Sequence, residues 1–462
     1  MEHKILKRYP IGNKRFLWKQ KDYVISTFSG FPESDTQEGD IDVVADRYAK
    51  YHKEAGFNLM ELGWVRHEGS WAAVDACEKN EINLVFQDMS MFGGMSFHHA
   101  DRSVPREELK ALVDKLKDKK YTIGYYVWDE PQTDAHMAEA RRQMDILQEL
   151  DPEALLFTCA VPDYNRNPDR AGALDDVSNG LGDTWENGRY VPYIERFAEK
   201  MDPPVMSFDY YPVGNYFNVW PGHTYSYENQ LDDSFMLLTM AVSRDVALRK
   251  NIPFWFYYQG YKLYKCTKEE DFIFPMVRCF MYAAVLYGAK GLQNYATGEK
   301  GNRFLNPDGT KGDFYEEQKK VNFEIVNLGN TLMALTSKLI IHSSDLLPGC
   351  EYTKPYFNSV EESEIFKGEL PKRCSIGELE DDYGNRYAVI LNRDYEKDVE
   401  FKLSLKDNFR VYEVSKADGK QRVIYDNTNE ISVKLQGGDA CLYRFQKASE
   451  EAFTVEYELT EQ

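Results

Sequence analysis

The sequence predicts an α/β protein in which eight parallel strands alternate with eight helices, followed by a smaller antiparallel β domain. Two patterns carry this prediction. Up to about residue 338, short apolar runs alternate with longer stretches whose apolar residues recur at helical spacing. From about Leu339 onward, apolar and polar residues alternate one by one between Gly, Asn and Asp turns, which is typical of antiparallel strands.

The predicted strands are rich in aromatic and β-branched residues, which favour extended backbone. The eight runs cover residues 23–31, 57–64, 82–92, 121–130, 154–165, 203–213, 252–261 and 289–299. A helical pattern follows each run, at residues 40–56, 69–81, 104–120, 135–151, 189–201, 234–251, 271–288 and 315–337. Eight such repeats indicate a TIM (β/α)8 barrel. An open doubly wound sheet could repeat in the same way, but no glycine-rich phosphate loop follows the first strand.

The change in pattern divides the chain into a barrel over residues 1–338, which begins with a short polar arm, and a C-terminal β-sandwich over residues 339–462. The segments 386–405, 409–426 and 431–446 supply the clearest strands of the second domain. The acidic tail after Ala448 either adds one strand or stays outside the fold.

Composition argues against several classes of partner. The formal net charge of −20 disfavours a nucleic-acid partner and an anionic membrane surface. It also disfavours a polyanionic substrate, unless one local basic pocket overrides the field of the whole protein. The seven cysteines are scattered and show no paired spacing, so neither a disulfide framework nor a zinc site is predicted, and no cofactor is expected.

No apolar run is long enough to cross a membrane, so membrane insertion is not predicted. The N-terminus MEHKILKRYP does not resemble a signal peptide. The sequence as written therefore predicts a cytoplasmic protein, whereas a periplasmic or secreted protein whose leader had been removed would look the same. The oligomeric state is left open by the sequence.

Polar and aromatic side chains follow the apolar part of most predicted strands. Active sites of such barrels lie at the C-terminal ends of the strands, so we expect these residues to line a cleft. Tyr and Trp rings at a cleft commonly stack on sugars, with core packing as their competing role. The candidate cleft residues are Trp64, Asp88, Trp128, Asp129, Glu130, Asp209, Tyr210, Tyr211, Gln259, Tyr261, Gln293, Asn294 and Tyr295.

The fourth strand ends in the carboxylate pair Asp129 and Glu130, and Pro131 cannot continue a ladder. A carboxyl group at the mouth of an apolar strand beside Trp128 can have its pKa raised toward neutrality, as a general acid requires. Alternation along the strands directs Glu130 and Asp209 into the mouth, and Asp129 toward the helices unless a bulge turns it inward. The alternative role of the pair is to cap the following helix. The alternative for Asp209 is a bond to backbone or to a tyrosine hydroxyl.

Three short motifs resemble parts of a known family. WDEP at residues 128–131 resembles the acid/base motif Asn-Glu-Pro on the fourth strand of a large clan of (β/α)8 glycoside hydrolases, which includes barrel galactosidases and glucanases. DYYP at residues 209–212 resembles the end of the sixth strand in barrel galactosidases, and LQGGDACLYRF at residues 435–445 resembles the last strands of the β-sandwich that often follows such barrels. The resemblance implies a glycosidase acting on a neutral or 2-acetamido oligo- or polysaccharide, with Glu130 as general acid.

One position departs from that family. Gln259 replaces the nucleophilic Glu at the end of the seventh strand, so a retaining mechanism with two carboxylates lacks its expected partner. Asp209 or Asp88 could instead act as base in an inverting reaction. Alternatively, Asp129 could orient a 2-acetamido group of the substrate while Glu130 protonates the leaving oxygen, as in enzymes resembling N-acetylhexosaminidases. The barrel could also bind sugar without cleaving it, or act as a sugar lyase or isomerase.

Overall fold

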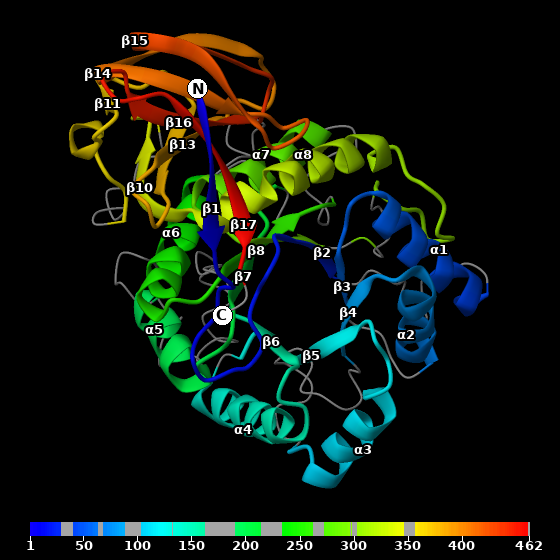
Figure 1. Cartoon of the computed structure of the whole chain (residues 1–462). Helices are drawn as coiled ribbons and strands as arrows, with labels where there is room; N and C mark the ends of the chain where they lie inside the picture. The colour runs from blue at the N-terminus through cyan, green and yellow to red at the C-terminus, as the bar shows by residue number, and fades with distance from the viewer. Residues whose placement is uncertain are drawn as a thin grey trace, which may run out of the picture.

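The computed structural model describes residues 1–28, 40–62, 68–87, 103–131, 133–161, 190–213, 233–261, 272–295, 297, 303–345 and 356–460. Within these residues, eight parallel strands form one sheet in the spatial order β6-β5-β4-β3-β2-β9-β8-β7. A parallel bridge between Ala160 and Phe208 brings the two ends of this order together, so the sheet is nearly closed into a barrel (Figure 1). The barrel strands are β2 (Val24–Phe28), β3 (Leu59–Glu61), β4 (Asn83–Phe86), β5 (Thr122–Asp129), β6 (Leu155–Cys159), β7 (Met206–Tyr210), β8 (Phe254–Gln259) and β9 (Gly291–Tyr295).

Helices follow the barrel strands along the chain and surround the sheet on its outside (Figure 1). The described helices are α1 (Ile41–Glu54), α2 (Glu68–Asn80), α3 (Arg106–Leu116), α4 (Asp134–Leu150), α5 (Tyr190–Met201), α6 (Asp233–Lys250), α7 (Phe274–Leu286) and α8 (Tyr315–Ala334). The predicted α/β fold with a TIM barrel is therefore confirmed.

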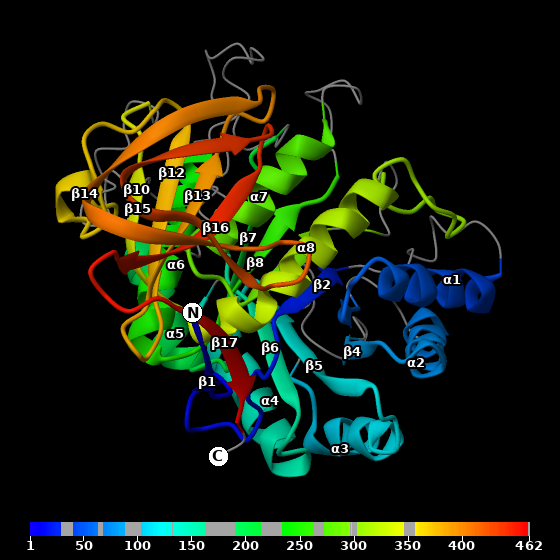
Figure 2. The same ribbon diagram turned by 45° about the horizontal axis from the view of Figure 1, so that its top comes forward.

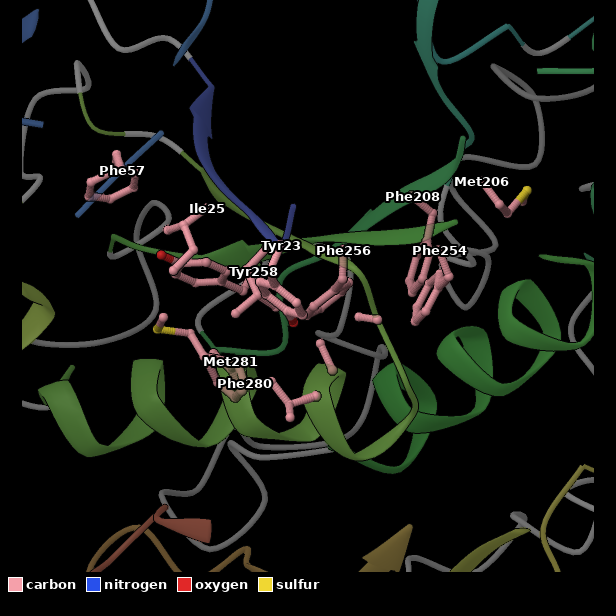
Figure 3. Packing of buried hydrophobic residues seen from close by; sticks show 14 of the residues in the cluster. Tyr23, Ile25, Phe57, Met206, Phe208, Phe254, Phe256, Tyr258, Phe280 and Met281 are labelled. Carbon is pink, nitrogen blue, oxygen red and sulfur yellow. The ribbon is translucent and has the colours of Figure 1, made fainter. Parts of the chain in front are cut away.

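Side chains of each barrel strand alternate between two apolar layers, as expected for a strand buried on both faces. On the outer face of β8, Phe254, Phe256 and Tyr258 lie in the same cluster as Phe280 and Met281 of α7 (Figure 3). The inner face contributes a smaller cluster that fills the barrel. Its largest members are Phe28, Tyr126, Phe157, Trp255 and Tyr257.

The C-terminal strands form a seven-stranded antiparallel sheet among the described residues. Register shifts between Ser404 and Phe409 interrupt the long strand β14, whose first part pairs with β11 and whose last part pairs with β16. The sheet thus curls around its own apolar core in a sandwich-like arrangement. Its strands are β10 (Thr336–His342), β11 (Phe366–Lys367), β12 (Cys374–Glu380), β13 (Arg386–Asn392), β14 (Val399–Val414), β15 (Gln421–Leu435) and β16 (Ala440–Lys447).

α7 lies between the barrel and the C-terminal sheet and is buried along nearly its whole length. Gly377 of β12 marks the closest approach, because a Cβ there would lie 2.1 Å from the carbonyl oxygen of Leu286 at the end of α7. Only glycine allows two backbones to pass so closely. The barrel and the C-terminal sheet also share one apolar cluster, which includes Phe280 of α7 and Val389 of β13.

The two ends of the chain pair with each other. β1 (Glu2–Arg8) and β17 (Phe453–Leu459) form a two-stranded parallel ribbon, visible in both views (Figures 1 and 2). The acidic tail thus adds one strand, which was one of the two alternatives, and the polar N-terminal arm supplies its partner.

Candidate functional site

A β-bulge in β5 decides which face its last residues occupy. The register against β6 shifts between Tyr126 and Trp128. Val127 and Trp128 consequently both pack in the outer core, whereas Tyr126 belongs to the barrel interior. Asp129 returns to the interior, where the Tyr126 hydroxyl donates a 2.8 Å hydrogen bond to its Oδ1. The bulge that the sequence analysis allowed for is therefore present, and it turns Asp129 inward.

Glu130 follows in the left-handed region of the backbone, with a φ of 50°. A residue with a Cβ rarely adopts this conformation, and such residues cluster at functional sites. Its N–H donates a 3.1 Å hydrogen bond to the carbonyl oxygen of Cys159, which holds Glu130 at the C-terminal end of β6. The residue is half-buried.

Cys159, the last residue of β6, lies within the electrostatic influence of three carboxylates. Burial raises the pKa of its thiol well above the ordinary value, and the charges of Asp209, Asp129 and Glu130 raise it further. Asp209 is only 6% exposed and shares its face of β7 with Ser207, which is bonded inside the barrel. The alternation that directed Asp209 inward is confirmed. The carboxylates of β5 and β7 thus flank the end of β6, which lies between them in the barrel.

The surroundings of Asp129 oppose its ionisation. Burial raises the pKa of Asp129 well above its ordinary value, and the hydrogen bond from Tyr126 partly offsets this rise. A carboxyl group in this setting holds a proton at a higher pH than an exposed aspartate. It can therefore donate a hydrogen bond or a proton where a solvated aspartate would be fully ionised.

Glu61, at the end of β3, is a fully buried carboxyl group that is not among the candidate residues selected from the sequence. Its Oε1 accepts hydrogen bonds from Ser26 Oγ at 2.5 Å and Gln293 Nε2 at 2.8 Å, and its Oε2 accepts one from the Tyr257 hydroxyl. Burial raises the pKa of Glu61 to about 7, against the effect of these three donors. The charge of Asp129 also contributes to this rise.

Four aromatic rings gather at the ends of β2, β8 and β9 and just after β7. Tyr211 stacks on Tyr295 with ring centroids 4.6 Å apart and an interplanar angle of 20°. Tyr261 and Phe28 contact the same Tyr295 ring at 5.7 Å and 5.5 Å. Tyr211 and Tyr261 are buried, whereas Tyr295 remains partly exposed. Among the aromatic residues that were expected to line the cleft, those of this cluster lie on the inner side of the barrel.

Three expected cleft residues lie on the helix side of the strands instead. Trp128 is 1% exposed and stacks on His136 of α4 at 5.4 Å, because the bulge in β5 turns its indole outward. Tyr210 belongs to the outer core, and the Asn294 side chain is bonded to the hydroxyl of Tyr258 in that layer. Tyr210 and Asn294 each directly follow an inward-facing residue, so alternation alone accounts for their outward direction.

Gln259 is fully buried, and its amide bonds backbone groups. Its Oε1 accepts a 2.8 Å hydrogen bond from the N–H of Val213, and its Nε2 donates to the carbonyl oxygens of Val213 at 2.6 Å and Tyr261 at 3.1 Å. Gln259 therefore fastens the chain after β7 to the chain after β8. Gln293, in turn, bonds Glu61 and Ser207 inside the barrel.

Trp64 and Asp88 lie outside the described residues. Over the described ranges, no three His, Cys, Asp or Glu side chains gather in a way that could hold a metal ion. No helix in the same ranges has the length and apolar character needed to span a bilayer.

Comparison with known proteins finds similarity at the level of structure alone. No family model and no curated protein matches the sequence. A proposed α-galactosidase from Bacteroides fragilis matches with a TM-score of 0.48 and 11% identity, over 92% of this chain and 79% of its own. A GH27 β-L-arabinopyranosidase from Geobacillus stearothermophilus matches with a TM-score of 0.43 and 8% identity, over 94% and 98%. An Anoxybacillus α-amylase matches with a TM-score of 0.45 and 10% identity, over 92% and 98%.

Proposed function

We propose that this protein is a glycoside hydrolase that cleaves O-glycosidic bonds of a neutral or 2-acetamido oligo- or polysaccharide. The observation that carries the proposal is the position of Asp129, Glu130 and Asp209 at the C-terminal ends of β5 and β7, the strands on either side of β6. Hydrolysis of a glycosidic bond needs one carboxyl group that protonates the leaving oxygen and a second that assists at the anomeric carbon. The C-terminal end of barrel strands is where such groups act in this fold.

Glu130 is the proposed general acid. Its half-buried position and its left-handed backbone, held by the bond to Cys159, support a side chain fixed at the edge of the barrel end. Such a position would let the carboxyl group reach a substrate from the barrel rim, whereas Asp129 lies deeper, on Tyr126.

Two roles remain open for the second carboxyl group. Asp209 would act as base in an inverting reaction, in which a water attacks from the opposite side of the sugar. Asp129 would orient a 2-acetamido group in a substrate-assisted reaction. The raised pKa of Asp129 and its hydrogen bond from Tyr126 support the second role, because a fixed, partly protonated carboxyl group can donate to or accept from an acetamido group.

The tyrosine cluster around Tyr295 supports a sugar substrate. Its ring is partly exposed and is held in place by stacking on Tyr211 and by tilted contacts with Tyr261 and Phe28. A rigid, partly exposed aromatic ring is suited to stack on the apolar face of a pyranose.

The proposal is tested by measuring hydrolysis of a panel of aryl glycosides and oligosaccharides, including 2-acetamido sugars, by wild type and Glu130→Gln. Glu153→Gln is the matched control, because it makes the same chemical change at an exposed position before β6, at the opposite end of the barrel. We expect turnover by wild type and by Glu153→Gln, and a loss of at least about a hundredfold in Glu130→Gln. Equal turnover by all three proteins would contradict the proposal.

The same panel separates the two roles of the second carboxyl group. An inverting enzyme would lose activity in Asp209→Asn, tolerate Asp129→Asn and release the product as the opposite anomer, which proton NMR detects within the first minutes. A substrate-assisted enzyme would act on 2-acetamido sugars only, be inhibited by a thiazoline analogue, and lose activity in Asp129→Asn.

A further inference from the structure

A second concave site lies at the other end of the barrel. It is a cavity of about 340 Å³ beneath the N-terminal ends of β8 and β9, opposite the carboxylates. Its walls come from the N-terminal arm, the end of α6, the start of β10 and the turn between β12 and β13. Cavities of this size hold small ligands in many proteins.

The charge of the cavity is opposite to that of the protein as a whole. Four basic side chains line it, namely Lys7, Arg8, Arg244 and Lys290, against the two acidic side chains of Asp381 and Asp382. The whole chain carries a formal net charge of −20. The cavity is therefore a local basic pocket of the kind that could admit an anion against the field of the protein.

Arg244 has few partners in this wall. Its Nε donates a 2.8 Å hydrogen bond to Ser337 Oγ, and no carboxylate of the described residues lies within ion-pair distance of its guanidinium. The neighbouring Asp245 is paired with Arg249, at 3.0 Å. Burial lowers the pKa of Arg244, which reflects a partly desolvated charge. The two Nη groups of such an arginine can bind a carboxylate or phosphate in a bidentate manner.

Lys290 and Arg8 are the two buried basic residues of the cavity. Burial and the charge of Arg8 lower the pKa of Lys290 to about 7, and a bound anion would favour its charged form. Lys290 is 7% exposed, and its Nζ donates to two main-chain carbonyl oxygens, those of Leu332 and Leu335. Arg8 is 6% exposed and reaches only one carboxylate among the described residues, that of Asp22 at 3.4 Å. Buried cations are costly unless an anion pairs with them, so an anionic ligand would lower the cost of both.

The acidic side chain nearest the interior does not neutralise these cations. Asp381 accepts hydrogen bonds from the N–H groups of Tyr383 and Asn385 at 2.9 Å and 2.7 Å, from the Asn385 side chain at 2.7 Å, and from the Tyr457 hydroxyl at 2.6 Å. Its carboxylate thus accepts hydrogen bonds from its own turn and from β17. Asp382 is exposed at the rim.

From these contacts we infer that the cavity binds a small organic oxyanion, with a carboxylate or a phosphate group placed on the guanidinium of Arg244. The ligand would touch the barrel, the N-terminal arm and the C-terminal sheet at once, and would tie these three parts together. The site is separate from the proposed catalytic end and does not depend on the proposed function.

Titration calorimetry on the full chain tests the inference with three probes: inorganic phosphate, glucuronate and, as an uncharged comparison, methyl β-glucoside. We expect wild type to bind phosphate or glucuronate, or both, below about 1 mM, and the neutral glucoside to show no binding at this site. Arg244→Met should weaken binding of the anion by more than about tenfold. Arg106→Met is the matched control, because it makes the same change at an exposed arginine of α3 that does not line the cavity, and it should leave the affinity unchanged.

Three results would overturn the inference: no binding of either anion up to about 10 mM, equal affinity of wild type and Arg244→Met, or displacement of the anion by the neutral glucoside. If Arg244→Met does not fold, Arg244→Lys decides the question, because lysine keeps the charge but lacks the planar fork. It should bind the anion at least about threefold more weakly than wild type, and an unchanged affinity would contradict the bidentate site. Glu130→Gln should bind the anion as wild type does, which distinguishes this cavity from the catalytic end.

Discussion

Replacing Glu61 by glutamine should change how the stability of the protein depends on pH. Glu61 is fully buried, and burial raises its pKa to about 7 from the ordinary 4.5. The folded protein therefore keeps a proton on Glu61 at a pH where the unfolded chain has released it. Its favourable contribution to stability is complete below pH 4.5 and is lost as the pH rises through about 7. Glutamine carries no such proton, so the variant does not share this loss.

The magnitude follows from the separation of the two pKa values. Each pH unit is worth about 1.36 kcal/mol, so the free energy of unfolding of wild type should fall by about 2 to 3 kcal/mol between pH 5 and pH 8 through this group. Glutamine resembles the protonated carboxyl group, because both can donate to the Tyr257 oxygen and accept from Ser26 and Gln293. The two proteins should be about equally stable near pH 5, and Glu61→Gln should be the more stable near pH 8.

Equilibrium urea unfolding at several pH values from 5 to 8 measures this difference directly. The quantity of interest is the free energy of unfolding of the variant minus that of wild type, which cancels the titration of groups common to both. Glu153→Gln, an exposed position, serves as control and should show a difference that does not vary with pH. Parallel pH profiles for wild type and Glu61→Gln would refute the reasoning, since they would mean that Glu61 titrates alike in the folded and unfolded states.

Three further changes have expected outcomes. Gln259→Leu should lower the free energy of unfolding by about 2 to 4 kcal/mol in urea titrations, because the buried N–H and carbonyl of Val213 lose their partner; a loss below about 0.5 kcal/mol would contradict this role. Gly377→Ala should destabilise the protein by about 3 kcal/mol or more, since its Cβ would lie 2.1 Å from the Leu286 oxygen; unchanged thermal unfolding would show that the interface yields easily. Tyr295→Leu should raise KM for the best glycoside by about five- to tenfold with kcat little changed, as expected for the loss of a stacking surface, and an unchanged KM would remove Tyr295 from the binding site.

The barrel could be predicted from the sequence because each of its strands and helices carries its own local pattern. A strand that is buried on both faces gives a short continuous apolar run, and a helix that is buried on one face gives apolar residues at helical spacing. Both patterns can be recognised within the segment itself, without knowledge of distant contacts. The ribbon of β1 and β17 could not be predicted in the same way. Its two strands are separated by almost the whole chain, and the polar residues of the arm give no sign of the partner.

The site was only partly predictable, because small irregularities decide which side chains face inward. Regular alternation predicted Asp209 correctly but would have placed Asp129 toward the helices, and nothing in YVWDEP reveals the bulge between Tyr126 and Trp128. Glu61 had a signal, an acidic residue inside the apolar run LMELGW. A single carboxylate in such a run is equally compatible with the inner and the outer face of the strand. Its contacts within the barrel could therefore be identified only from the structure.

The most direct test of the central claim is the effect of Glu130→Gln on substrates with different leaving groups. If Glu130 protonates the leaving oxygen, kcat for a glycoside with a poor leaving group, such as an alkyl group, should fall by about a hundredfold or more. The fall should be small for a dinitrophenyl glycoside, whose leaving group departs without protonation. An equal loss on both substrates, or no loss on either, would contradict the assignment of Glu130 as the general acid.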